Sequence, residues 1–287
     1  MRALYDVPAP AKLNLFLHVT GRRADGYHLL QSAFMLVDWQ DTLHFELRPG
    51  GHLSREDLGP ALPPEDLVLR AARALQQATG SAAGAHIQVD KRIPAEAGMG
   101  GGSSDAASCL LALNRLWNLG LGLPALEKIG LGLGADVPFF LRGRNAWVEG
   151  IGEAITPISV PPARFAVVKP AAGLATKNIF QDPSLKRDSD SATIAGFAAN
   201  PFGFGHNDLE PVARRLCPEV DEALQWLGSQ GLRGRMTGSG SAVFAKIPPL
   251  WAPGQTLAQA PAGWVARECS NMEVHPLVGW APSDDSV

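Results

Sequence analysis

One stretch of this chain carries its strongest structural signal: Pro94-Ala95-Glu96-Ala97-Gly98-Met99-Gly100-Gly101-Gly102-Ser103-Ser104-Asp105-Ala106-Ala107. Four glycines within five residues allow positive φ angles and a close approach of the backbone to a ligand. Ser103 or Ser104 can cap the following helix, which we expect over residues 104–117 because its apolar residues form a wide helical face. The free N–H groups and the dipole of a helix start attract anions, so the stretch predicts a phosphate site.

Two known phosphate-binding motifs do not match this loop. A Walker loop needs a lysine and then Ser or Thr directly after its glycines, and no lysine stands there. The dinucleotide fingerprint needs a glycine where this chain has Ser103. The alternative is a flexible strand-to-helix loop without a ligand. The density of glycines and their place before a capped helix favour phosphate.

Hydrophobic alternation predicts a strand upstream of this loop, over residues 11–19. Its spacing places Lys12 and Asn14 on one face, about 7 Å apart along the strand. We expect that face, which also holds Phe16 and His18, to be open, and the opposite face, with Ala11, Leu13, Leu15, Leu17 and Val19, to be buried. Further strands are expected at residues 42–47 and 85–89, and a helix at residues 66–77.

The second half of the chain alternates helix and strand signals in the same way. Pro161-Pro162 breaks the pattern and is the expected boundary between two domains, residues 1–160 and 161–287, of an α+β fold. Residues 182–206 are expected to form a long surface loop, and residues 283–287 to fray. Helices are expected at residues 124–129 and 208–227, the latter as one or two; strands are expected at 146–149, 164–169, 233–237, 242–247, 263–267 and 272–275.

Composition excludes several classes of protein. With 287 residues, 46% of them hydrophobic and 18% charged, the chain can bury a large core and is not disordered. A net charge of −3 and the lack of a basic run argue against nucleic acid as a partner. No window of 18 uncharged apolar residues is present, so no membrane partner is expected. Three widely spaced cysteines and an N-terminus without an apolar signal region predict a cytoplasmic protein with reduced thiols.

Two further segments contain candidate functional groups. In Gly134-Ala135-Asp136-Val137-Pro138-Phe139-Phe140, the carboxylate of Asp136 is either a helix cap or an acidic group beside the phosphate, able to accept a hydroxyl proton. The segment Arg235-Met236-Thr237-Gly238-Ser239-Gly240-Ser241-Ala242-Val243-Phe244 is either a plain hairpin or a loop that closes over the reacting phosphate. Lys12 on its own would be an ordinary solvated lysine.

Five segments together resemble one family. They are Pro10-Ala11-Lys12-Leu13-Asn14-Leu15, Arg23-Ala24-Asp25-Gly26-Tyr27-His28, the glycine-rich loop with its helix start, the Asp136 segment and Met236-Thr237-Gly238-Ser239-Gly240. In this order they resemble the GHMP superfamily of small-molecule kinases, and the resemblance runs from about residue 9 to about residue 274. The glycine loops are shared across the superfamily. The Lys-Leu-Asn-Leu and Asp-Gly-Tyr-His pieces are more specific, and in them the chain most resembles members whose implied substrate is a cytidine diphosphate-linked methylerythritol.

The resemblance implies a fold of two domains with the active site in the cleft between them. It implies an ATP-dependent kinase in which Asp136 deprotonates the attacking hydroxyl and Lys12 polarises that hydroxyl and neutralises phosphoryl charge. ATP, as co-substrate, would be bound by Lys91, Gly98, Met99, Gly100, Gly101, Gly102, Ser103 and Ser104, and covered by Thr237, Gly238, Ser239 and Gly240. The small-molecule substrate would be bound by Asn14, Asp136 and Thr176, with its base stacked between Tyr27 and Phe180 and hydrogen-bonded by His28. Mg²⁺ is implied by ATP chemistry, without assigned ligands.

Two residues depart from the pattern of the family. Met99 replaces the usual Leu of the loop, a swap that conserves volume. Asp66 stands where relatives often have Asn, which puts a polar contact at that position in doubt. The rival functions are another GHMP kinase, for a sugar, an amino acid or a mevalonate derivative, and a nucleotide-binding sensor that has lost turnover. The sequence assigns no oligomeric state.

Overall fold

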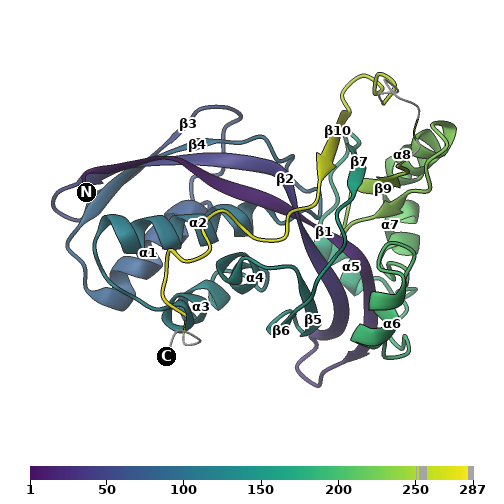
Figure 1. The fold of residues 1–287 in the computed structure, drawn as a ribbon, viewed down its shortest axis with the longest axis horizontal. Helices are drawn as coiled ribbons and strands as arrows, with labels where there is room; N and C mark the ends of the chain where they lie inside the picture. Colours follow the sequence, from purple (N-terminus) through teal and green to yellow (C-terminus); the bar gives the residue numbers. More distant parts are fainter. Residues whose placement is uncertain (250, 252–256, 284–287) are drawn as a thin grey trace.

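A computed structural model describes residues 1–249, 251 and 257–283, and its α+β architecture is the one expected (Figure 1). Of the tail expected to fray, residues 284–287 lie outside the described residues. The first sheet has the strand order β3-β4-β2-β5-β6, with β1 paired to β2, and the second has the order β10-β7-β9-β8. The strands of the first sheet are β1 (Ala3–Arg22), β2 (His28–Arg48), β3 (Leu53–Asp57), β4 (Gly84–Asp90), β5 (Ala146–Gly150) and β6 (Ala154–Pro157).

The hairpin of β1 and β2 is much longer than the alternation predicts, and it places Lys12 opposite Leu36. The expectation of one open face is wrong. Lys12, Asn14, Phe16 and His18 are all buried, at 4%, 2%, 1% and 8% exposed. Helices cover one face of this sheet, while the second sheet packs on the other, so both faces of the strand lie in the interior.

A break in register explains why the expected faces do not persist along β1. The pairing with β2 shifts between Asn14 and Leu17, as at a β-bulge. Leu15 and Phe16 therefore both enter the core cluster between the two sheets, although they are neighbours in sequence. Upstream of the shift, Lys12 and Asn14 lie on the same side of the strand, where their side chains are hydrogen-bonded to each other, as the spacing predicts.

Four helices pack on the first sheet: α1 (Leu67–Thr79), α2 (Gly101–Leu116), α3 (Leu123–Leu131) and α4 (Val137–Arg142). Their apolar faces close one core, in which Leu110 and Phe139 are fully buried. Capping of α2 by a serine is wrong: Gly100 occupies the N-cap with φ 73°, and no side chain caps the helix. Ser104 lies inside the helix and donates its hydroxyl to the carbonyl of Pro10, at 2.7 Å.

The second sheet consists of β7 (Arg164–Lys169), β8 (Arg235–Met236), β9 (Val243–Ile247) and β10 (Val265–Ser270). It is accompanied by α5 (Thr176–Gln181), α6 (Ile194–Ala199), α7 (Glu210–Leu216) and α8 (Pro218–Ser229). The expectation of an unstructured loop over residues 182–206 misses α6, which Thr193 caps and Phe197 anchors in the core. The expected strand at residues 272–275 is wrong, because this segment makes only an isolated bridge, between Arg144 and Val274.

The last described residues return to the first sheet instead of ending beside the second (Figure 1). The amide of Met272 donates to Leu36 of β2 at 2.9 Å, and Leu277 joins the core of the helix layer. The division of the chain into two domains at residue 160 therefore stays a prediction. None of the helices in the described ranges combines the length and apolar character that crossing a membrane would need.

Candidate active site

A cavity of about 680 Å³ lies where β1, the glycine-rich loop, the start of α4, and the loops after β7 and β8 meet. Fragments of the chain separated by more than two hundred residues contribute to its wall. Of the residues singled out by the sequence, it is lined by Lys12, Asn14, Lys91, Gly98, Met99, Gly100, Gly101, Gly102, Ser103, Asp136, Thr176, Phe180, Gly238, Ser239 and Gly240. Tyr27, His28, Ser104 and Thr237 are not among its lining residues.

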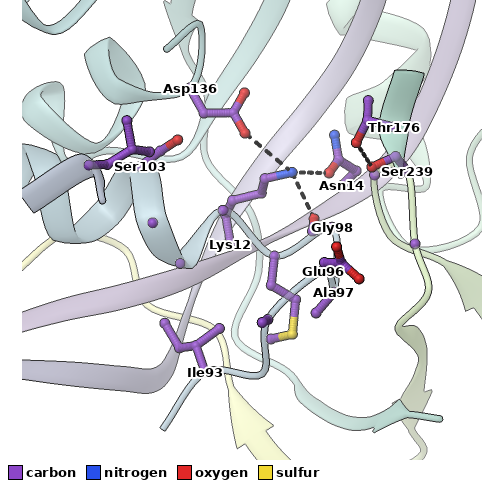
Figure 2. A pocket seen from close by; sticks show the side chains of 18 of the residues that line it. Lys12, Asn14, Ile93, Glu96, Ala97, Gly98, Ser103, Asp136, Thr176 and Ser239 are labelled. Carbon is purple, nitrogen blue, oxygen red and sulfur yellow. Dashed lines mark hydrogen bonds and ion pairs between the residues drawn. The ribbon is translucent and has the colours of Figure 1, made fainter. Parts of the chain in front are cut away.

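The ammonium of Lys12 is the central cation of this cavity (Figure 2). It donates to the side-chain oxygen of Asn14 and, at 3.0 Å, to the carbonyl of Gly98. The third group near it is the carboxylate of Asp136, at 3.7 Å. Burial lowers the pKa of Lys12, while the Asp136 charge and hydrogen bond oppose that effect. A buried ammonium with fixed acceptors is already aimed at the place where an anionic group would bind.

Asp136 is freer than its position suggests. It is the N-cap residue of α4, as the capping alternative supposed, but its side chain makes no capping hydrogen bond. Its carboxylate is 30% exposed and faces Lys12 across the cavity (Figure 2). One oxygen is thus held near the ammonium, and the group stays accessible to a hydroxyl. This geometry favours the functional interpretation of Asp136.

The glycine-rich loop is tied to β1 on both sides of its turn. The amide of Lys12 donates to the carbonyl of Met99 at 3.0 Å, and the side chain of Met99 is buried between the two sheets. Gly100 needs its positive φ, and a side chain there would meet the ring of Phe140 at 2.9 Å. The loop is therefore held by backbone and packing contacts of the protein itself, and the start of α2 lies on the cavity wall.

The loop after β8 packs directly on the glycine-rich loop. The hydroxyl of Thr237, which is fully buried, accepts from the amide of Asn14 at 2.9 Å. Ser241 and Ala242 donate their amides to Glu96 and Ala97 at 3.0 and 3.3 Å. Gly238, Ser239 and Gly240 remain on the cavity wall, where the hydroxyl of Ser239 lies 2.7 Å from that of Thr176. Thr237 thus holds the loop in place, and its neighbours face the cavity.

Gly98→Ala is expected to separate these two loops. The new Cβ would lie 2.2 Å from the carbonyl oxygen of Thr237 and 2.9 Å from the amide nitrogen of Gly240, both backbone atoms. Gly120→Ala is the matched control, because Gly120 has nearly the same φ (68° against 69°) and nothing within 4 Å of its Cβ. We expect Gly98→Ala to lose about 3 kcal/mol of stability and most activity, and Gly120→Ala about 1 kcal/mol with full activity. Calorimetry and an ADP-release assay measure both; equal losses in the two variants would contradict the close packing.

A buried charge cluster lies behind the glycine-rich loop. Lys91 donates to Asp41 and, at 2.6 Å, to Asp105 of α2. Asp41 is fully buried and also accepts the amides of Arg92 and Ile93. Burial raises the pKa of Asp105 to about 8, with Lys91 opposing and Asp41 adding to the shift. Its Oδ1 is buried without a hydrogen-bond partner among the described residues. The cluster fixes Lys91 on the cavity wall.

Asp105→Asn is expected to change how stability depends on pH. The folded protein keeps a proton on Asp105 that the unfolded chain releases near pH 4, so this group's contribution is full at low pH and is lost as pH rises to about 8. The asparagine cannot titrate, so the variant should gain stability relative to the wild type between pH 5 and pH 9. Ser108→Ala, on the same helix, should change stability equally at all pH values. Thermal unfolding across this range measures both, and parallel curves for Asp105→Asn and the wild type would contradict the raised pKa.

Only one of the two aromatic rings predicted to stack on the substrate, that of Phe180, lines the cavity. Phe180 of α5 lines it, and the ring of His28 lies beside that of Phe180, with centroids 5.0 Å apart and planes at 31°. Tyr27 is 62% exposed on the turn before β2. The stacking of a base between Tyr27 and Phe180 therefore stays a prediction, and the ring that the structure places next to Phe180 is that of His28.

Sequence reasoning missed several residues around this cavity. Asp105 stands within the quoted glycine-rich stretch but received no role, and Asp41 sits in a strand without any motif around it. Arg187 lies in the segment expected to be a plain loop, yet it contacts His28. Asp66, the departure from the family pattern, caps α1 by accepting from the amide of Leu69 at 3.1 Å. The carboxylate of Asp66 therefore makes a polar contact at this position.

The comparisons with known proteins agree with this geometry. Family models described as GHMP kinases N terminal domain and GHMP kinases C terminal match residues 66–144 and 193–250. The 4-diphosphocytidyl-2-C-methyl-D-erythritol kinases of Paracidovorax citrulli and Variovorax paradoxus are 65% and 64% identical to this chain, over 99% and 98% of it and over all of each relative. A crystal structure of 4-(cytidine 5'-diphospho)-2C-methyl-D-erythritol kinase superposes with a TM-score of 0.73 at 33% identity, covering 94% of this chain and 99% of that one. The chain belongs to the 4-diphosphocytidyl-2-C-methyl-D-erythritol kinase family of the GHMP kinases.

Proposed function

We propose that this chain transfers the γ-phosphoryl group of ATP to the C2 hydroxyl of 4-diphosphocytidyl-2-C-methyl-D-erythritol, in the non-mevalonate pathway to isoprenoid precursors. It is a small-molecule kinase that uses ATP as phosphate donor. The observation that carries the reaction is the approach of Lys12 to Asp136, 3.7 Å apart, beside the glycine-rich loop. The observation that carries the choice of substrate is the near full-length identity with relatives of this name.

The site residues divide the chemistry between them. Asp136 accepts the proton of the attacking hydroxyl, which its exposure and its freedom from capping allow. Lys12 lies between that carboxylate and the carbonyl of Gly98, where it balances charge that develops on the transferred phosphoryl group. The amides of the glycine-rich loop and of α2 receive the ATP phosphates. Phosphoryl transfer needs such positioning and charge balance more than covalent catalysis.

Magnesium would enter this site with ATP. Among the described residues no group of three or more His, Cys, Asp or Glu could hold a metal ion. A Mg²⁺ carried by phosphates needs only one or two protein oxygens and keeps several waters. The hydroxyl of Ser103 lines the cavity next to the glycine-rich loop and is the oxygen that would hold it, which leaves Asp136 free to take the hydroxyl proton. When bound, the ion supplies positive charge to the phosphate oxygens.

The rest of the substrate would extend away from the glycine-rich loop. Asn14, Thr176 and Phe180 also line the cavity, and the cytosine would stack on Phe180. His28 would hydrogen-bond the edge of the base, and Tyr27 would cover its open side.

The three cysteines are unpaired and buried, which accords with the reducing cytoplasm, where we place the reaction.

An ADP-release assay with a panel of hydroxyl substrates tests the proposal. We expect turnover with the cytidine diphosphate-linked methylerythritol and about 10³-fold lower kcat/KM with homoserine, mevalonate or a sugar, which lack a base to bind. Preference for one of these would favour a different GHMP kinase. Binding of ATP without turnover on any substrate would favour the sensor, which the pairing of Lys12 with Asp136 argues against.

A further inference from the structure

Arg187 makes an unusual set of contacts next to Phe180, which lines the cavity. Its guanidinium donates from Nη1 to the carbonyl of Leu185 at 2.9 Å, and from Nη2 to the carbonyls of Phe180 and Asp182 at 3.1 and 2.7 Å. The remaining Nε–H donates to Nε2 of His28 at 3.0 Å. The side chain therefore connects the segment after α5 with the first residue of β2.

These donors leave His28 a single protonation pattern. A guanidinium carries five N–H donors and no acceptor. A ring nitrogen that receives a hydrogen bond from it must offer a lone pair, so Nε2 of His28 carries no proton. The neutral ring then has its proton on Nδ1. Burial, and the positive charges of Arg187 and Arg22, lower the pKa of His28, which agrees with a neutral ring.

We infer that Arg187 is a positioning residue, which fixes His28 in the Nδ1–H tautomer and so presents one oriented donor to the base of the substrate. Among the hydrogen bonds of the described residues none involves Nδ1 of His28, so this donor is available for a ligand. The hydrogen bond from Arg187 restrains the ring, which lies 5.0 Å from that of Phe180, and Arg187 also holds the carbonyl of Phe180.

The fixed tautomer determines what the base must offer. The N–H at Nδ1 pairs only with an acceptor, and cytosine has such atoms at its ring N3 and its O2, next to a donor amino group. A histidine free to change tautomer would also present an acceptor at Nδ1, which would pair with the amino group of the base instead. Arg187 thus adds selectivity without touching the substrate. The contact between His28 and cytosine rests on the proposed function, whereas the tautomer of His28 does not.

A loop clamp is the competing explanation for Arg187. Its three carbonyl contacts could serve only to hold residues 180–187 in shape. Arg215 supplies the matched control, because it binds the carboxylate of Asp182 in the same segment, and no hydrogen bond or ion pair among the described residues joins it to His28. Arg22→Gln controls for charge. The charge of Arg22 lowers the pKa of His28, but its Nε donates to the carbonyl of Gly26 and not to His28.

Nitrogen NMR on the histidine-labelled protein without substrate tests the tautomer. In the wild type we expect a protonated Nδ1 and an unprotonated Nε2 for His28, with the signals assigned by their loss in His28→Gln. Arg187→Gln should give a mixture of tautomers, because an amide can accept as well as donate. Arg215→Gln and Arg22→Gln should keep the wild-type pattern. A proton on Nε2 in the wild type, or an unchanged pattern in Arg187→Gln, would overturn the inference.

Kinetics on the same variants test the consequence. Arg187→Gln should raise KM for the cytidine-linked substrate about tenfold, with kcat and KM for ATP nearly unchanged. An equal rise of KM in Arg215→Gln would mean that Arg187 is only a clamp. If the wild type does not phosphorylate this substrate at all, the proposed function fails, while the NMR experiment still decides whether Arg187 sets the tautomer.

Discussion

Asp136→Asn should lower kcat about 10³-fold while ATP still binds. The amide has the size of the carboxylate but cannot take a proton from the attacking hydroxyl. The change should leave the fold intact, because the side chain makes no capping hydrogen bond to α4 and is 30% exposed. Lys12 keeps two of its acceptors, Asn14 and Gly98. The loss should therefore fall on the chemical step.

A single-turnover experiment with saturating ATP and substrate separates this step from binding and product release. Asp90→Asn serves as control, since Asp90 is a carboxylate paired with Arg92 at the end of β4, outside the cavity wall. Near-normal phosphoryl transfer in Asp136→Asn would remove Asp136 from the role of base. A loss of ATP affinity with normal transfer would assign it to nucleotide binding.

Local patterns were enough to locate part of this site, while Thr176, Phe180 and the catalytic role of Asp136 entered through the resemblance to the family. Glycine density before an apolar helix marked the loop at residues 98–104, and alternation placed Lys12 and Asn14 on one side of a strand. Both inferences use only the sequence within a few residues of the site. They predicted a glycine-rich backbone before a helix start and two side chains on one side of a strand, and the structure brings Lys12, Asn14 and residues 98–103 to one cavity. The roles of these residues in binding and catalysis stay predictions.

The environment of Lys12 could not be predicted in this way. Its burial depends on Phe34 and Gly98, which come from other parts of the chain, and on a sheet whose second face is covered. An alternating sequence pattern predicts a strand with one buried face. That prediction fails when a second layer packs on the opposite face of the sheet. The bulge after Asn14 likewise arises from pairing with β2, and the sequence of β1 alone does not predict it.

Long-range partners also explain the missed residues. Asp41 and Lys91 are fifty residues apart in sequence, and the contact of Arg187 with His28 spans 159. Neither pair has a spacing that a helix or strand period would bring together. Short helices inside a polar stretch are also hard to predict from sequence. The helix α6 has only six residues, and its capping residue Thr193 has no feature that distinguishes it from a threonine in a loop. Only the tertiary fold distinguishes these residues from surface residues.

Lys12→Met should lower kcat by about 10³-fold to 10⁵-fold, the range seen when a cation is removed from a phosphoryl-transfer site. Methionine fills the space of the lysine stem, so the cavity wall should not collapse. Stability should change far less than activity. Removal of the ammonium leaves the carbonyl of Gly98 and the amide oxygen of Asn14 with only the Thr237 hydroxyl as a donor among the described residues, 3.5 Å from each, but it also removes the cost of burying a charge.

Lys12→Arg should not restore activity, although it keeps the charge. The stem of Lys12 lies under the glycine-rich loop, with its Cε 3.3 Å from the position of a Cβ on Gly100, and a guanidinium is larger than an ammonium. Rapid-quench measurement of phosphoryl transfer in both variants, with their melting temperatures, checks these expectations. Full activity in Lys12→Met would show that the transition-state charge is balanced elsewhere.

The double variant Lys12→Met/Asp136→Asn tests whether the two groups act as one unit. If Lys12 polarises the hydroxyl that Asp136 deprotonates, each single change already disables the shared step, and the double variant should be only slightly slower than the slower single one. Independent roles would instead multiply the two losses. Since the groups lie 3.7 Å apart and the pKa of Lys12 responds to the charge of Asp136, we expect the non-additive result.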